Sequence, residues 1–134
     1  MSAGSPRFPV SVKGVVLRAG RVILLRNERD EWELPGGRLE ADETPEGCVA
    51  REIEEELGLG VSVGPLLDCW LYEPLPGRRV LIVTYGCVAQ DDRAPALSDE
   101  HRALAWFDAR ALDALALPAG YRRAIARWLA TDGA

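Results

Sequence analysis

Three glutamates, Glu52, Glu55 and Glu56, are the residues whose types and spacing are best suited to chemistry. Residues three and four apart on a helix are neighbours, so a helix here would bring the three carboxylates together at one edge. Oxygen ligands without nearby imidazole or thiolate groups suit a hard cation such as Mg²⁺ or Mn²⁺. The alternative is a solvated acidic face, since like charges at this spacing cost only about 0.2–0.5 kcal/mol per pair.

The element that must position these acids is a helix predicted over Pro45–Leu57. Thr44 is a suitable N-cap, proline suits the first helical position, and Gly58 suits a left-handed stop. Apolar residues recur at every fourth position and form a stripe that must pack against a core. The stripe consists of Val49, Ile53 and Leu57.

The stretch from Gly37 to Leu59 resembles the signature of the Nudix hydrolases, G-x5-E-x7-R-E-U-x-E-E-x-G-U, in which U is a bulky aliphatic residue. A match of this length is far more specific than a lone glycine motif. The preceding Leu34-Pro35-Gly36-Gly37 is also typical of the family. The specified positions are met by Gly37, Glu43, Arg51, Glu52, Ile53, Glu55, Glu56, Gly58 and Leu59.

The resemblance implies an α/β fold, a Nudix-type α/β/α sandwich with a mixed β-sheet. It also implies metal-assisted hydrolysis of the pyrophosphate bond in a nucleoside diphosphate linked to another moiety, with Mg²⁺ or Mn²⁺ as cofactor. The metal would be held by Glu52, Glu55, Glu56 and the carbonyl of Gly36. Glu52 or Glu100 would be the general base, with Asp99 as a competitor of Glu100. His101, the single histidine, is not expected to be a ligand.

Three further residues are candidates for binding the substrate. Arg26 ends an apolar run with a charge that could reach a phosphate, although a solvated arginine at a strand end is equally consistent. Arg38 matches a basic residue that is usual in the family, which implies phosphate contact. Pro74 stands where the ADP-ribose-cleaving branch has a proline, although a proline in a turn needs no functional reason.

Glu43 and Arg51 are interpreted as a pair that orients the loop before the helix, because metal-binding carboxylates need partners that hold their rotamers. Pro74 favours ADP-ribose or a related nucleotide sugar as substrate. The alternatives are a nucleoside triphosphate pyrophosphohydrolase of the pool-cleaning type and a regulatory module that binds a nucleotide without cleaving it. An isomerase of prenyl diphosphates is disfavoured.

The composition predicts one domain over residues 1–134, with residues 1–8 as a flexible tail. A net charge of −5 argues against nucleic acid or an anionic membrane as the main partner, and favours a small nucleotide handled through a cation. Three cysteines without metal-ligand spacing, and no apolar signal core, favour a reduced cytoplasm. The family's ADP-ribose branch often dimerises, but the sequence shows no interface.

The remaining pattern predicts strands and helices that interleave without regular βαβ repetition, hence a mixed sheet with helices on both faces. Gly14 indicates a bulge or a close approach in the first strand. The predicted segments are a hairpin of 10–18 and 22–26, antiparallel strands at 61–72 and 79–90 joined by a loop at 73–78, a loop at 91–99, a strand at 103–107, and helices at 109–117 and 121–130.

Overall fold

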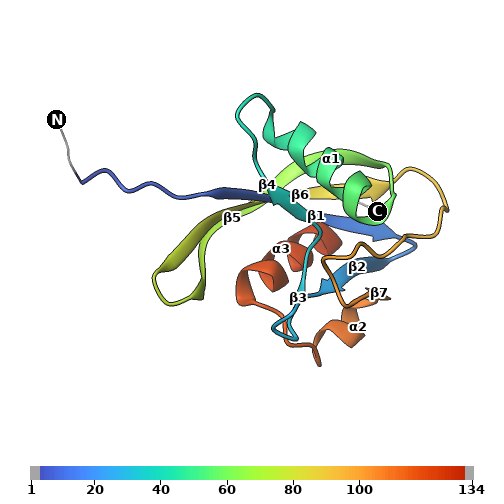
Figure 1. Cartoon of the computed structure of the whole chain (residues 1–134). Coiled ribbons are helices and arrows are strands. Elements are labelled where there is room, and N and C mark those ends of the chain that lie inside the picture. Colours follow the sequence, from blue (N-terminus) through green and yellow to red (C-terminus); the bar gives the residue numbers. More distant parts are fainter. Residues whose placement is uncertain (1–3, 132–134) are drawn as a thin grey trace.

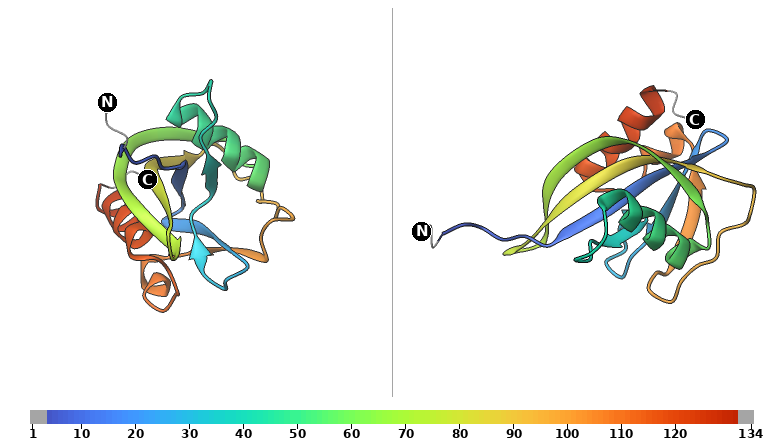
Figure 2. Two further views of the ribbon diagram at one scale, coloured as in Figure 1. Left: turned by 60° about the vertical axis from the view of Figure 1, so that its left-hand side comes forward. Right: turned by 90° about the horizontal axis from the view of Figure 1, so that it is seen from above.

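The computed structural model describes residues 4–131 (Figure 1). Helix α1 covers one face of a twisted sheet and helix α3 covers the other, as Figure 2 shows from above. The elements are β1 (Val10–Arg18), β2 (Arg21–Arg26), β3 (Trp32–Glu33), β4 (Gly36–Arg38), α1 (Pro45–Leu57), β5 (Val61–Leu75), β6 (Arg78–Ala89), β7 (Ala103–Phe107), α2 (Ala109–Leu112) and α3 (Ala119–Ala130).

The seven strands form one mixed sheet in the order β3-β2-β1-β6-β5, with β4 added to β1 and β7 added to β2. The pairing of β1 with β6 is parallel, and the other pairings are antiparallel. One edge of β1 is shared, because its first half pairs with β4 and its end pairs with β2. The predicted mixed α/β architecture is therefore confirmed.

The predicted β1–β2 hairpin forms, with Leu17 opposite Val22 and a turn at Ala19 and Gly20. Both turn residues have positive φ, 52° and 76°. Two left-handed residues in succession match the right-handed twist of the flanking strands. The turn residues therefore set the register that directs alternate β1 side chains to the two faces.

Helix α1 has the predicted ends: the Thr44 side chain accepts a hydrogen bond from the Gly47 N–H at 3.0 Å, and Gly58 has φ 68°. Its apolar stripe is fully buried against the sheet. The helix approaches β1 closely at Gly14, where an added Cβ would lie 2.8 Å from Cδ1 of Ile53. The predicted close approach at Gly14 is confirmed, and it fixes the height of α1 above the sheet.

The other face is covered by α3, which buries Tyr121, Ala124, Ile125 and Trp128. Trp128 lies over Gly86 of β6, and its indole N–H donates to the carbonyl of Cys87 at 3.1 Å. The two faces thus have separate cores, one under α1 and one under α3. No helix in the described part of the chain is long and apolar enough to cross a membrane.

Two predicted boundaries were wrong. The helix predicted at 109–117 ends at Leu112. Side-chain nitrogens of Arg122 donate hydrogen bonds to the backbone carbonyls of Leu112 and Leu115 at 2.9 and 3.1 Å, and these bonds stabilise the non-helical segment that follows. The loop predicted at 73–78 is mostly strand, because β5 continues to Leu75, opposite Arg78. Long-range contacts decided both cases over local turn and helix preferences.

Candidate metal and phosphate site

Glu56 is the most deeply buried carboxylate of the acidic helix, with 8 % of its surface exposed. Its Oε1 accepts a hydrogen bond from the N–H of Gly36 at 2.8 Å, so the last turn of α1 is joined to β4. Burial raises the pKa of Glu56 to about 7, although the Gly36 hydrogen bond and the charges of Lys13 and His101 favour the ionised form. An additional positive charge at this carboxylate would therefore be favourable.

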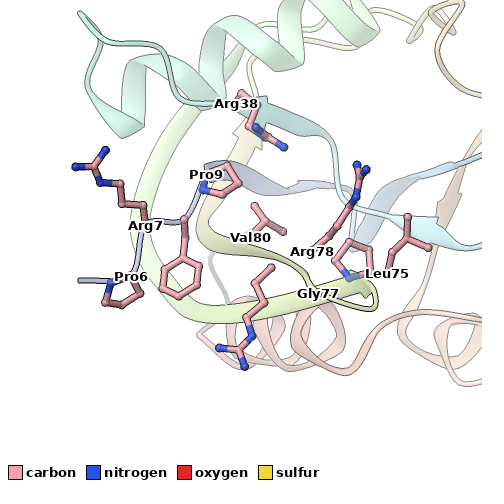
Figure 3. Close-up of a pocket in the computed structure, with 11 residues that line it drawn as sticks. Pro6, Arg7, Pro9, Arg38, Leu75, Gly77, Arg78 and Val80 are labelled. Atoms are coloured by element: carbon pink, nitrogen blue, oxygen red, sulfur yellow. The ribbon is translucent and has the colours of Figure 1, made fainter. Parts of the chain in front are cut away.

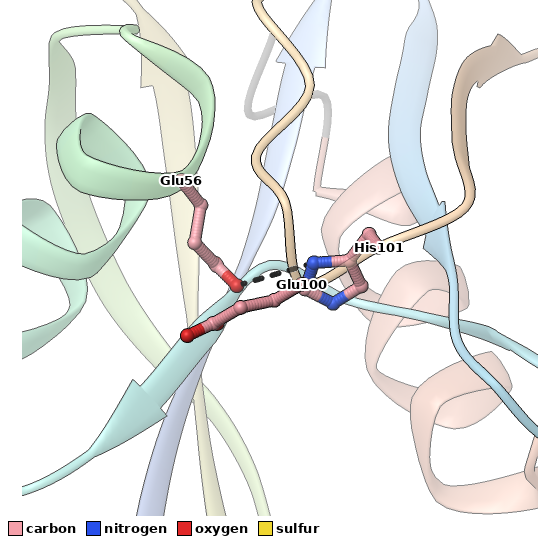
Figure 4. A group of neighbouring side chains, drawn as sticks. All are labelled: Glu56, Glu100 and His101. Atoms are coloured by element: carbon pink, nitrogen blue, oxygen red, sulfur yellow. Dashed lines mark ion pairs between the residues drawn. The ribbon is translucent and has the colours of Figure 1, made fainter.

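His101 lies beside Glu56 and was not expected at the site. Its Nε2 is 2.8 Å from Oε2 of Glu33, and its Nδ1 is 3.8 Å from Oε2 of Glu56, as the dashed line in Figure 4 marks. Nδ1 is buried and has no hydrogen-bond partner among the residues described. The hydrogen bond with Glu33 is the main cause that raises the pKa of His101.

Glu33 binds the imidazole of His101 at Nε2, the ring nitrogen that does not face Glu56. Burial opposes ionisation of Glu33, but the His101 hydrogen bond, the charge of Lys13 and the hydrogen bond from Asn27 outweigh it and lower its pKa to about 2. A carboxylate on one ring nitrogen fixes the orientation of the ring and directs the other nitrogen. Here the other nitrogen is directed at Glu56.

Glu56, Glu100 and His101 each offer one ligand atom, and the three atoms lie within 4.8 Å of one another. Figure 4 shows that Glu100 and His101 come from the same loop while Glu56 comes from α1. Two carboxylates and a nitrogen atom without a hydrogen-bond partner form a donor set that fits a divalent cation. The sequence placed Glu56 and Glu100 here but set His101 aside, because nothing local ties a loop histidine to Glu33.

Glu52 and Glu55 face the same hollow, a cavity of about 260 Å³ lined by Glu52, Glu55, Glu56, Ser98, Asp99 and Glu100. Burial raises the pKa of Glu52. The Glu52 carboxylate lies so close to Gly37 that a Cβ at that glycine would overlap it. The three helix acids therefore converge, as their spacing indicated, on one cavity beside Gly36 and Gly37 of β4.

Arg51 occupies the outer side of this acidic cluster. It donates to Glu43 at 2.8 and 2.9 Å and to Glu55 at 3.0 Å, so the pair predicted between Glu43 and Arg51 forms. The Arg51 hydrogen bonds lower the pKa of Glu43 to about 2. Of the three helix acids, Glu55 therefore has the shortest contact with the Arg51 guanidinium.

The substrate residues suggested by the sequence divide between two places. Arg38 and Pro74 line a second cavity of about 690 Å³, drawn in Figure 3 at the end of the β5–β6 hairpin. Arg26 lies outside both cavities, 3.6 Å from Asp30 and with its guanidinium 5.9 Å from the centre of the Trp32 ring. The second cavity is lined by Pro6, Arg7, Phe8, Pro9, Arg38, Pro74, Leu75, Gly77, Arg78, Arg79 and Val80.

Part of the segment interpreted as a flexible tail forms a wall of this larger cavity. Pro6, Arg7 and Phe8 line it, whereas residues 1–3 lie outside the described residues. Four arginines and no acid are among its lining residues. Such a lining favours an anionic ligand with an apolar part.

Lys13 was also missed. It is a buried residue of β1, with 9 % of its surface exposed, and lies opposite Gly36 on β4. A signal existed in the sequence, because this lysine interrupts an otherwise apolar strand. Its neighbours could not be inferred, since they come from β3, α1 and the loop before β7.

Comparisons with known proteins agree with this geometry. A family model described as NUDIX domain matches residues 7–129. A MutT-like protein of Streptomyces ambofaciens is 54 % identical over 104 residues, which are 76 % of this chain and 65 % of that protein. An 8-oxo-dGTP diphosphatase of Proteus vulgaris is 43 % identical over 51 residues, 38 % of this chain and 45 % of that protein. The chain thus spans between about half and two thirds of these relatives.

Among solved structures, a MutT NUDIX hydrolase from Burkholderia pseudomallei superposes with a TM-score of 0.75 at 31 % identity, covering 91 % of this chain and 98 % of that one. A MutT protein from Methanosarcina mazei Go1 gives a TM-score of 0.78 at 27 % identity, covering 98 % and 99 %. The agreement therefore extends over more than nine tenths of the chain.

Proposed function

The chain belongs to the Nudix family, and from this premise we propose that it is a pyrophosphohydrolase that cleaves a nucleotide with the help of Mg²⁺ or Mn²⁺. The observation that supports this most is the convergence of Glu52, Glu55, Glu56 and Glu100 on one cavity, in a protein that also has a separate arginine-lined cavity. The acids would hold the cation, and the arginine-lined cavity would hold the organic part of the substrate.

The proposed ligands are Glu52, Glu55, Glu56, Glu100 and the Gly36 carbonyl. A bound divalent cation would supply positive charge to the phosphoryl oxygens and acidity to water. Around it, the Gly36 N–H keeps Glu56 in place, and Glu33 through His101 limits how that carboxylate can turn. The Glu43–Arg51 pair would position the loop before α1 and keep Glu55 oriented.

We assign the general base to Glu52 and a ligand role to Glu100. Burial raises the pKa of Glu52, which brings the carboxylate closer to the proton affinity that base catalysis at neutral pH requires. Glu100 instead has its ligand atom within the group formed with Glu56 and His101. Asp99 lines the same cavity but is not part of that group.

The larger cavity would bind the nucleoside side of the substrate. Arg38 lines this cavity and directly follows Gly37, the glycine beside the Glu52 carboxylate. Arginines can bind phosphate oxygens with paired hydrogen bonds, and the apolar residues beside them can cover a base or sugar. Arg26 lines neither cavity and is paired with Asp30, so we propose it only as a surface residue.

Two substrate classes compete. Pro74, which matches a proline of the family's ADP-ribose-cleaving branch, lies in the wall of the cavity and supports a nucleotide sugar of the ADP-ribose type. The Proteus relative carries the name of an enzyme for a nucleoside triphosphate. Because that match covers only part of each protein, both classes remain candidates, and a non-catalytic nucleotide-binding module is the third.

A substrate panel separates these possibilities. We expect the purified protein with Mg²⁺ or Mn²⁺ to cleave ADP-ribose, UDP-sugars or nucleoside triphosphates, with products identified by mass spectrometry. Glu56→Gln should lower turnover by about a hundredfold or more while the protein still melts cooperatively, because the amide keeps the volume but loses the charge. Glu54→Gln is the matched control, since Glu54 is exposed on the same helix. Binding of nucleotides without turnover would support the module instead.

A further inference from the structure

Lys13 is a buried amine that the proposed roles above do not use. It is the only lysine of the chain, which otherwise carries fifteen arginines as its basic residues. It lies in the middle of β1, next to Gly14, whose N–H donates to the carbonyl of Pro35 at 3.0 Å. Lys13 is thereby fixed beside the turn that enters β4.

The ammonium group is surrounded by acids but paired with none of them. Among residues 4–131, no carboxylate oxygen lies within 4.0 Å of its nitrogen, and its side chain donates no hydrogen bond. Its charge nevertheless favours ionisation of Glu33, Glu52 and Glu56. An ammonium group has three hydrogen-bond donors, so those of Lys13 are free to bind a ligand oxygen.

The strand register relates Lys13 to residues of both candidate binding regions. Ser11 lies opposite Arg38, and Lys13 lies opposite Gly36. Residues two apart on a strand, and residues directly opposite across a pair, share one face of the sheet. Arg38 lines the large cavity and the Gly36 N–H binds Glu56, so Lys13 lies beside the residue that binds Glu56 and two residues along β1 from the position opposite Arg38.

We propose that Lys13 is a substrate-binding residue whose ammonium donates hydrogen bonds to a phosphoryl oxygen of the pyrophosphate group. This assignment rests on the proposed function, because it takes the pyrophosphate to lie between the large cavity and the acids. A lysine suits the place, since its compact charge on a flexible stem can reach a single oxygen where a planar guanidinium would need more room. The cation and Lys13 would then share the charge of the two phosphates.

The alternative is that Lys13 only offsets the charge of the surrounding acids. In that case its ammonium would not contact a phosphate, and its surroundings would change little when a phosphate ligand binds. Since the chain has one lysine, protein grown with lysine labelled with ¹³C at Cε gives one lysine Cε resonance, which reports on this residue alone.

The test is an NMR titration of the labelled parent protein, first saturated with Mg²⁺ and then titrated with inorganic pyrophosphate. We expect the lysine Cε resonance to move in a saturable way on addition of pyrophosphate, beyond any change caused by Mg²⁺ alone. A resonance that stays in place while other signals show that pyrophosphate is bound would overturn the proposal. No turnover is needed, so absence of hydrolysis would not affect the result.

Calorimetry of two variants completes the test. Lys13→Met should weaken pyrophosphate binding by about ten- to a hundredfold, the usual loss for one hydrogen bond to a charged group. Arg21→Met, which removes an exposed cation at the start of β2, should bind like the parent. If Lys13→Met melts cooperatively and binds pyrophosphate with the parent affinity, the assignment is wrong. If it does not fold, the titration of the parent still decides.

Discussion

Glu56 and Glu43 lie near opposite ends of α1, and their surroundings shift the two pKa values in opposite directions. Burial raises the pKa of Glu56 to about 7. The hydrogen bonds from Arg51 lower the pKa of Glu43 to about 2. Glu56 is buried, whereas Glu43 belongs to an outer network with Arg51 and Glu55.

The difference separates two tasks that one acidic stretch performs. Glu43 and Glu55 already have a cationic partner in Arg51, and the Glu43–Arg51 pair joins the loop to the helix. Glu56 lies near Lys13 and His101 without a close, full ion pair, whereas Glu52 lies 3.4 Å from Arg51, so Glu56 retains the most affinity for an added cation. A sequence of glutamates alone does not reveal this division, because it depends on which carboxylate Arg51 reaches.

The largest expected effect comes from Ile53→Asp, which would remove the support that both regions share. Ile53 is fully buried and touches β1 at Gly14. A carboxylate at this position should cost more than about 4 kcal/mol and abolish cooperative melting, measured by circular dichroism. Glu54→Asp, an exposed position on the same helix, is the control and should melt like the parent. A parental melting curve for Ile53→Asp would show that the stripe does not anchor the helix.

The second effect distinguishes the proposed general base, Glu52, from the proposed metal ligand, Glu100. Glu52→Gln should lower kcat by about a hundredfold or more even at saturating Mg²⁺, because the base is lost. Glu100→Gln should mainly raise the Mg²⁺ concentration needed for half-maximal activity, because a ligand is lost. Rates measured across a range of Mg²⁺ concentrations separate the two. The reverse pattern would assign the base to Glu100.

The smallest effect concerns the outer acids. Glu43 has a folded-state pKa near 2 against an ordinary value of 4.5, so its ionisation stabilises the protein above pH 4.5, and this stabilisation is lost as the pH falls toward 2. Glu43→Gln should therefore lower the melting temperature modestly at pH 7, and the difference from the parent should shrink below pH 4.5.

Melting curves between pH 7 and pH 3 test this expectation, with Glu54→Gln as the variant that removes an exposed acid outside the Arg51 network. A difference between Glu43→Gln and the parent that stays constant over this range would mean that the Arg51 pair does not stabilise the fold.

Much of the fold could be predicted because its signals are local. The ends of α1 follow from Thr44 and Gly58, and the β1–β2 hairpin follows from Ala19-Gly20 between two apolar runs. The end of α2 and the extension of β5 could not be predicted, since Arg122 and the β6 ladder come from elsewhere in the chain. Local preferences differ by only fractions of a kcal/mol, so such contacts override them.

The candidate site divides in the same way. The sequence by itself determined the helix, its buried stripe and the convergence of Glu52, Glu55 and Glu56, because helix geometry fixes residues three and four apart. The Glu43–Arg51 pair was expected from the sequence as well, but it depends on how the loop before the helix folds back. Only the tertiary structure brought Lys13, Glu33 and His101 beside Glu56, and only it joined the segment before β1 to the β5–β6 hairpin as one cavity. Those neighbours come from separate strands and loops, and their distances depend on how the sheet is assembled.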